Sequence, residues 1–150
     1  MKAFSVVVFD IDGTIANNEH RRKWLEQSPK DWKRYNEGMA DDGVYHDIVH
    51  LMYQLYYNNK IILCTGREET FREVTEEWLR KNDISEYVEE IYMRPAKDYR
   101  PDSVVKVELL QRIETAFWAR PWLWIDDRQQ VVDAIRAEGI RVLQVAPGNF

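Results

Sequence analysis

Two carboxylates end an apolar run near the start of the sequence. Residues 4–9 read FSVVVF, and Asp10 and Asp12 follow before Gly13 turns the chain. Side chains alternate along a strand, so an extended path through this stretch would place both carboxylates on one side. One carboxylate can attack phosphorus as a nucleophile, and a second can protonate the leaving oxygen and later activate water. Asp10 and Asp12 are therefore candidate catalytic residues for phosphoryl transfer, although an acid pair at the end of a strand, taken alone, more often belongs to a turn or a helix cap.

More polar residues follow other apolar runs. The like charges of Asp10 and Asp12 are close together, which is costly unless a cation or a proton offsets them. Carboxylate oxygens with no histidine or cysteine beside them favour Mg²⁺ over zinc or copper. A hydroxyl and main-chain amides can hold phosphate oxygens, and a lysine can neutralise the remaining charge. The candidates for these roles are Asp126 and Asp127 for the metal, Thr65 and Gly66 for the phosphate, and Lys106 or Lys97 for the charge.

Five apolar runs of strand length alternate with segments of helical length. The runs are continuous, which is typical of strands that are covered on both faces. The alternation predicts an α/β fold with a doubly wound, mostly parallel five-stranded sheet. Ligands bind such sheets beyond the carboxyl ends of the strands, where these polar residues lie. The predicted strands are 4–9, 61–64, 88–92, 122–125 and 142–145, and the predicted helices are 45–58, 69–81, 102–117 and 129–138.

Two helix ends carry recognisable signals. Gly139 follows the last helical segment and predicts its end. Asp102 and Ser103 have short polar side chains of the kind that cap helix N-termini, so either one is a candidate cap for the helix over 102–117.

Residues 15–43 interrupt the alternation and predict a small helical insertion after the first strand, within a single domain over residues 1–150. Between His20 and Tyr35 there are six Lys or Arg residues against two acids, together with Trp24 and Trp32. Such a segment can hold a nucleic-acid strand by phosphate contacts and base stacking. The alternative is a solvated amphipathic helix whose tryptophans pack on the core.

The length, net charge and cysteine content of the chain restrict the class of protein. The chain has 150 residues and a net charge of −5, so no overall field attracts nucleic acid, and we expect contact with only one or two nucleotides at an end. A single cysteine, Cys64, excludes an internal disulfide and suits a reducing compartment. No apolar run is long enough for a membrane span or a secretion signal, so we expect a cytoplasmic protein, in the host cytoplasm if the gene is from a phage.

Four stretches in order resemble the motifs of the haloacid dehalogenase (HAD) superfamily of phosphotransferases. They are "VVFDIDGT", "LCTGR", a downstream lysine and "WIDDR". The resemblance implies that Asp10 is the nucleophile, Asp12 the general acid and base, Thr65 a ligand of the phosphoryl group and Lys106 its stabiliser. An aspartate at position 12 favours phosphate transfer over dehalogenation.

The same resemblance implies a Mg²⁺ site. Its ligands would be Asp10, the main-chain carbonyl of Asp12 and one or both of Asp126 and Asp127. The sequence leaves open which of the last two residues contacts the metal.

Three further stretches resemble the 3′-phosphatase domains of phage polynucleotide kinases. They are "RPDSVVK", "IDDRQQVVDAIRAEGI" and "LQVAPGNF". By position, this resemblance implies substrate-binding or supporting roles for Arg21, Arg67 and Asp102. Arg128, at the end of a predicted strand, is a further candidate for substrate binding, and Thr65 stands where the phage domain usually has serine.

We therefore expect a Mg²⁺-dependent phosphomonoester hydrolase that acts through an aspartyl-phosphate and removes 3′-phosphates from polynucleotide ends. The alternative is a phosphatase of mononucleotides or other small phosphomonoesters. A receiver module is a third possibility, but its acceptor aspartate would follow the third strand, which here ends in Met93 and Arg94. The chain has no Gly-x-x-x-x-Gly-Lys-Ser/Thr motif, so we expect no kinase activity from it.

Overall fold

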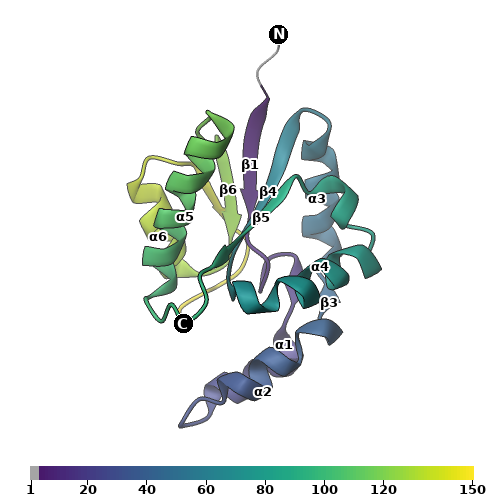
Figure 1. Cartoon of the computed structure of the whole chain (residues 1–150), viewed down its shortest axis with the longest axis vertical. Coiled ribbons are helices and arrows are strands. Elements are labelled where there is room, and N and C mark those ends of the chain that lie inside the picture. Colours follow the sequence, from purple (N-terminus) through teal and green to yellow (C-terminus); the bar gives the residue numbers. More distant parts are fainter. Residues whose placement is uncertain (1–3) are drawn as a thin grey trace.

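The computed structural model describes residues 4–150 and contains a five-stranded sheet with the strand order β5-β4-β1-β6-β7 (Figure 1). Every neighbouring pair in the sheet is parallel. The predicted doubly wound sheet is therefore confirmed. Its strands are β1 (Ser5–Phe9), β4 (Asn59–Glu68), β5 (Glu90–Arg94), β6 (Leu123–Asp126) and β7 (Val142–Gln144).

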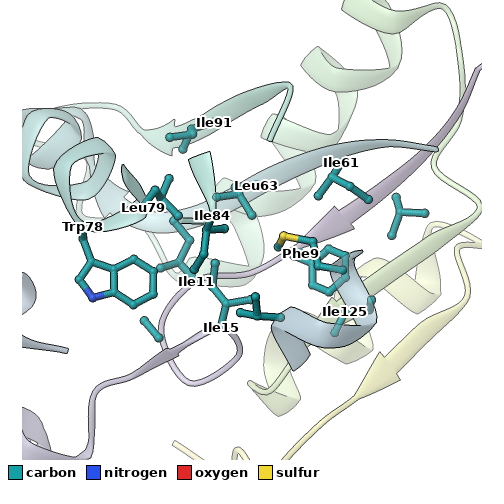
Figure 2. Packing of buried hydrophobic residues seen from close by; sticks show 14 of the residues in the cluster. Phe9, Ile11, Ile15, Ile61, Leu63, Trp78, Leu79, Ile84, Ile91 and Ile125 are labelled. Carbon is teal, nitrogen blue, oxygen red and sulfur yellow. The ribbon is translucent and has the colours of Figure 1, made fainter. Parts of the chain in front are cut away.

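Helices cover both faces of the sheet (Figure 1). One face packs against α3 (His46–Tyr56) and α4 (Arg72–Lys81), and the other packs against α5 (Asp102–Phe117) and α6 (Gln129–Ala137). The central strand β1 serves both layers because its side chains alternate. Val7 and Phe9 join the first core, shown in Figure 2, while Val6 and Val8 join the second. Burial on both faces explains the continuous apolar runs.

The N-termini of α4 and α5 differ from the predictions, the first in its boundary and the second in its cap. Residues Glu69–Phe71 form a separate 3-10 turn, so α4 begins at Arg72. The expected cap of α5 was wrong, because Pro101 occupies the N-cap position and Asp102 is the first helical residue, with no side-chain capping bond. The Asp102 carboxylate is directed to Arg94 instead. Gly139 does follow the end of α6, with φ +84, a conformation that glycine adopts without strain.

The segment over residues 15–43 contains two helices, α1 (Glu19–Glu26) and α2 (Trp32–Glu37), and a 3-10 turn at Met39–Asp41. Two short antiparallel strands, β2 (Ala16–Asn17) and β3 (Gly43–Val44), join it to the rest of the chain. In Figure 1 the two helices project beyond one end of the sheet. We refer to residues 15–43 as the insertion. Among residues 4–150, no helix is long and apolar enough to cross a membrane.

Candidate active site

A cavity of about 720 Å³ lies where the carboxyl ends of β1 and β4 meet the insertion. Its volume is in the range of pockets that hold small organic ligands, well above what a phosphate alone requires. Of the candidate catalytic, substrate-binding and metal-binding residues, those that line it are Asp10, Asp12, Gly66, Arg67, Asp102, Asp127 and Arg128. Four further candidates, Arg21, Thr65, Lys106 and Asp126, are buried and do not line it, while Lys97 is exposed.

Asp10 lines the cavity and contacts a buried lysine. The ammonium group of Lys106, which comes from α5, lies 2.8 Å from Oδ1 of Asp10 and 2.8 Å from Oδ2 of Asp126. The hydroxyl of Thr14 donates to Oδ2 of Asp10 at 3.1 Å. Burial, and then the charge of Asp126, raise the pKa of Asp10 well above its usual range, although Lys106 acts in the opposite direction. The carboxylate is thus held in place in a site with excess negative charge.

Asp126 and Asp127 complete a group of three buried acids. Asp10, Asp126 and Asp127 each offer an oxygen within 4.8 Å of the others. Both oxygens of Asp126 are already used, because Oδ1 accepts from the main-chain N–H groups of Asp127 and Arg128, and Oδ2 accepts from Trp124 and the lysine described above. Asp126 is therefore bonded to the protein on every side.

Asp127 differs from its neighbour. Its Oδ2 atom is buried and accepts no hydrogen bond within residues 4–150, and its side chain lines the cavity. Burial and the charge of Asp126 raise its pKa. A Cβ atom at Gly13 would lie 2.2 Å from this oxygen, so only glycine leaves room for it. An unpartnered carboxylate oxygen beside two other acids fits a hard divalent cation.

Asp12 belongs to a different network from Asp10. The extended path assumed from the sequence does not continue, because the chain turns at Ile11, whose carbonyl accepts from the amides of the three residues 14–16. Oδ1 of Asp12 lies 2.5 Å from Arg21 and 2.7 Å from Arg67, and Oδ2 accepts from Nε of Arg67 at 3.0 Å. Burial alone would raise the pKa of Asp12, but the two arginines lower it to about 2. Asp12 is therefore ionised at neutral pH.

Asp42 is a buried residue of the insertion that sequence reasoning missed. Its carboxylate accepts two bonds from Arg21 at 2.7 Å, one from Arg67 at 3.1 Å and one from His20 at 2.8 Å. Two buried arginines require counter-charges, and Asp12 supplies only one. Asp42 supplies the second, and it joins the insertion to the end of β4. The available signal was this need for charge balance, since no sequence period marks the position.

Asp102 organises the edge of the cavity. Its Oδ1 accepts from Arg94 at 3.1 Å, and its Oδ2 lies 3.5 Å from Arg128. A Cβ atom at Gly66 would lie 2.3 Å from Asp102 Oδ1, and Arg94 also donates to the carbonyl of Gly66 at 2.9 Å. The hydroxyl of Thr65, just below, accepts from the amide of Arg67 at 3.1 Å. These contacts bring the end of β4 against the start of α5.

The structure bears on two questions that the sequence left open: which lysine belongs to the site, and where the tryptophans of the insertion lie. Lys106 lies among the acids, whereas the side chain of Lys97 is exposed, so the geometry favours Lys106 as the lysine of the site. In the basic segment, Arg21 faces inward, and neither Trp24 nor Trp32 joins the buried core. Trp32 lines the cavity instead. The alternative in which the tryptophans of the insertion pack on the core was therefore wrong.

The family can be assigned from the sequence as a whole. Residues 4–150 match the family model described as the polynucleotide kinase PNKP phosphatase domain. The chain belongs to this family. It is accordingly a phosphatase of the HAD superfamily, a phosphomonoester hydrolase, and both resemblances noted in the sequence are confirmed.

Solved structures agree with this assignment. A chain of a Pnkp1/Rnl/Hen1 RNA repair complex is 27% identical, with a TM-score of 0.78, and a chain of a second Pnkp1/Rnl/Hen1 complex is 28% identical, with the same score. Both matches cover all of this PNKP-type phosphatase chain but only 45% and 49% of the other chains, so it spans about half of their length. A haloacid dehalogenase-like hydrolase from Streptococcus pneumoniae, 13% identical with a TM-score of 0.69, covers 96% of this chain and 85% of its own, and shares the fold.

Proposed function

We propose that this phosphatase removes 3′-phosphates from polynucleotide ends with the help of Mg²⁺, through a phosphoryl group carried by Asp10. The observation that supports the chemistry most strongly is the position of Asp10. It lines the cavity, in contact with a buried lysine and within reach of two further carboxylates. The family assignment supports hydrolysis of a phosphomonoester, and the geometry supports this residue as the nucleophile.

In the proposed first step, an oxygen of Asp10 attacks the terminal phosphorus atom. The bond from phosphorus to the sugar oxygen breaks, and Asp12 gives a proton to that oxygen. In the second step, water attacks the phosphorus of the acyl phosphate and Asp12 takes its proton, which releases inorganic phosphate and the free Asp10. The ionised Asp12 of this structure is the form that acts in the second step. To act in the first, it must acquire a proton as its arginine partners are drawn towards the phosphate.

The acidic group has the composition of a Mg²⁺ site. The metal would be held by Asp10, the main-chain carbonyl of Asp12 and Asp127, whose buried Oδ2 has no other partner within residues 4–150. Asp126 would orient the site through its four hydrogen bonds without contacting the metal. When bound, Mg²⁺ would offset the clustered negative charge and polarise the phosphate.

The remaining polar groups suit the phosphoryl group and its surroundings. Thr65 and the amides around Gly66 lie at the end of β4, and Lys106 adds a positive charge that reaches Asp10. Such donors stabilise the charge that develops on the phosphoryl oxygens. Arg67 and Arg128 line the same cavity and are proposed to contact the substrate.

We expect Asp127→Asn to abolish stabilisation of the protein by Mg²⁺. For the wild type, Mg²⁺ at a hundredfold excess over its Kd should add about 2.7 kcal/mol to the free energy of unfolding. Burial and Asp126 raise the pKa of Asp127, so protons should compete with the metal and this gain should shrink as the pH falls through that pKa. Thermal unfolding with Mg²⁺ or with EDTA at several pH values measures the effect.

Asp126→Asn provides the matched control. Its amide nitrogen would face N–H donors, which should cost about 1–3 kcal/mol of stability even without metal. Asp127→Asn removes an unpartnered buried charge and should instead raise the Tm in EDTA. If Asp127→Asn kept the full Mg²⁺ effect, the assignment of this ligand would be wrong.

The proposed substrate rests on the family and on the shape of the cavity. One similar structure, matched over the whole of this chain, is a chain of an RNA repair complex, and the cavity is much larger than a phosphate. Purified protein with Mg²⁺ should release phosphate from 3′-phosphorylated oligonucleotides at least tenfold faster, in kcat/KM, than from 5′-phosphorylated oligonucleotides or from 3′- and 5′-mononucleotides. A preference for the mononucleotides would favour the alternative, a phosphatase of small phosphomonoesters, and would overturn the polynucleotide proposal.

A further inference from the structure

The outer part of the cavity carries exposed aromatic rings that the phosphoryl chemistry does not use. Trp32 of α2 is 53% exposed and Tyr99, in the loop between β5 and α5, is 86% exposed, yet both line the same cavity as Asp10. Aromatic side chains that pack in the core are largely buried, so these two exposed rings beside a catalytic group do not serve the core. In proteins that bind single-stranded nucleic acid, such rings form the surfaces on which bases stack.

Both aromatic positions are held by the surrounding structure. The ring of Trp32 meets the ring of Tyr35 edge to face at 5.9 Å, and the Arg21 guanidinium lies 4.2 Å from the centroid of the Tyr35 ring. The main chain on both sides of Tyr99 is braced, because Arg94 donates to the carbonyl of residue 98 at 3.0 Å and to that of residue 100 at 2.7 Å. The Trp32 ring and the main chain at Tyr99 therefore lose little conformational freedom when a ligand binds.

Two cations of the cavity are available for phosphate groups. Arg22 and Lys30 line the cavity from the insertion, and in the part of the chain from residue 4 onwards neither has a carboxylate oxygen within 4.0 Å. Lys30 Nζ lies 5.9 Å from the centroid of the Trp32 ring. Arg100, by contrast, is paired with Asp98 and Glu108. A ring with a free ammonium group nearby matches a base and the phosphate linked to it.

We propose that Trp32 and Tyr99 hold the terminal base of an unpaired 3′ end by stacking, while Lys30 and Arg22 contact the phosphate of the preceding linkage. This inference rests on the proposed 3′-phosphatase function and adds the substrate class. A base stacked on protein rings has left its own helix, so the enzyme acts on single strands or frayed ends. Base stacking does not depend on sequence, because every base has a π face, so the preference is for an unpaired end rather than for a particular base.

The test compares Trp32→Ala, Tyr99→Ala and the double variant with the wild type on two single-stranded oligonucleotides with a 3′-phosphate. One carries a normal terminal nucleotide, and the other carries an abasic sugar at that position. On the normal substrate, each single variant should raise KM at least fivefold, with the loss in KM rather than in kcat. On the abasic substrate, the KM difference between variants and wild type should disappear. Trp118→Ala, which changes a tryptophan that is 95% exposed and does not line the cavity, is the control.

The outcomes separate this inference from the proposed function. Equal KM values for wild type and variants on the normal substrate, or an equal loss on the abasic substrate, would overturn base stacking while 3′-phosphate release by the wild type still supports the function. If the wild type releases no phosphate from either oligonucleotide, the proposed function fails, and the inference fails with it. Restoration of KM by Trp32→Phe would support stacking, since phenylalanine keeps an aromatic face.

Discussion

Asp10→Asn should lower the phosphatase kcat by about 10⁴-fold or more while leaving the fold intact. The amide oxygen can still accept the bond from Lys106, and the amide nitrogen can donate to the Thr14 hydroxyl, which then acts as the acceptor. The substitution also removes one charge from a group of acids in which the charge of Asp126 already raises the pKa of Asp10. What is lost is the nucleophilic oxygen, and loss of a nucleophile has effects of this size. Steady-state phosphate release on the preferred substrate measures the rate, and circular dichroism checks the fold.

Asp12→Asn is the informative comparison for that experiment. With an aryl phosphate the leaving group needs no proton, so Asp12→Asn should still form the phosphoryl-enzyme and then hydrolyse it slowly. Rapid mixing should therefore show a burst of the aryl alcohol equal to the enzyme concentration. Asp10→Asn should show no burst and no gain of a phosphoryl group in its intact mass. A burst in Asp10→Asn would mean that another residue carries the phosphoryl group.

Lys106→Met should have the second largest effect, on stability as well as on activity. Lys106 is buried and lies 2.8 Å from two carboxylates, so its removal leaves Asp10 and Asp126 without their counter-charge. Breaking a buried ion pair in this way costs about 3–5 kcal/mol in the free energy of unfolding. We also expect at least a hundredfold loss of kcat, because the charge beside the phosphoryl group disappears. Urea unfolding in EDTA and steady-state kinetics measure the two effects.

Lys97→Met is the matched control, since the sequence offers both lysines for the same role. The Lys97 side chain is exposed, and the residue contributes a main-chain bond to Glu68 that the substitution keeps. Its stability should change by less than about 0.5 kcal/mol, with no change in turnover. The opposite result, in which Lys97→Met loses activity and Lys106→Met keeps it, would contradict the assignment of the lysine.

The sheet and its helices were predictable because burial leaves a strong pattern in the sequence. The strands β1 and β6 are covered on both faces, so they appear as unbroken apolar runs, and the acids that follow them stand at the carboxyl ends. The positions of Asp10, Asp126 and Asp127 around one point follow from that topology. Periodicity, however, says nothing about which oxygen of an acidic pair is left without a partner.

The contacts of the insertion were not predictable in the same way. Asp42 follows a short 3-10 turn, and its two arginine partners are 21 and 25 residues away in the chain, so no local rule links them. The role of Asp102 was ambiguous for a similar reason, since a cap and an arginine partner use the same side chain, and only the position of Pro101 decides between them. Likewise, a tryptophan at position 32 fits a core or a surface equally well until the path of α2 is known.

The attachment of the insertion suggests that its outer part could be exchanged. Its base is fastened by the β2–β3 ribbon, by the bond from the amide of Tyr45 to the carbonyl of Ile15 and by the contacts between Arg21 and Asp42. Residues 22–37 lie between these contacts in the chain, and none of them is assigned a role in the two chemical steps. Chimeras that keep all three contacts and vary this segment could therefore retarget the enzyme to other phosphorylated ends, whereas a deletion that removes Arg21 or Asp42 would damage the reaction centre itself.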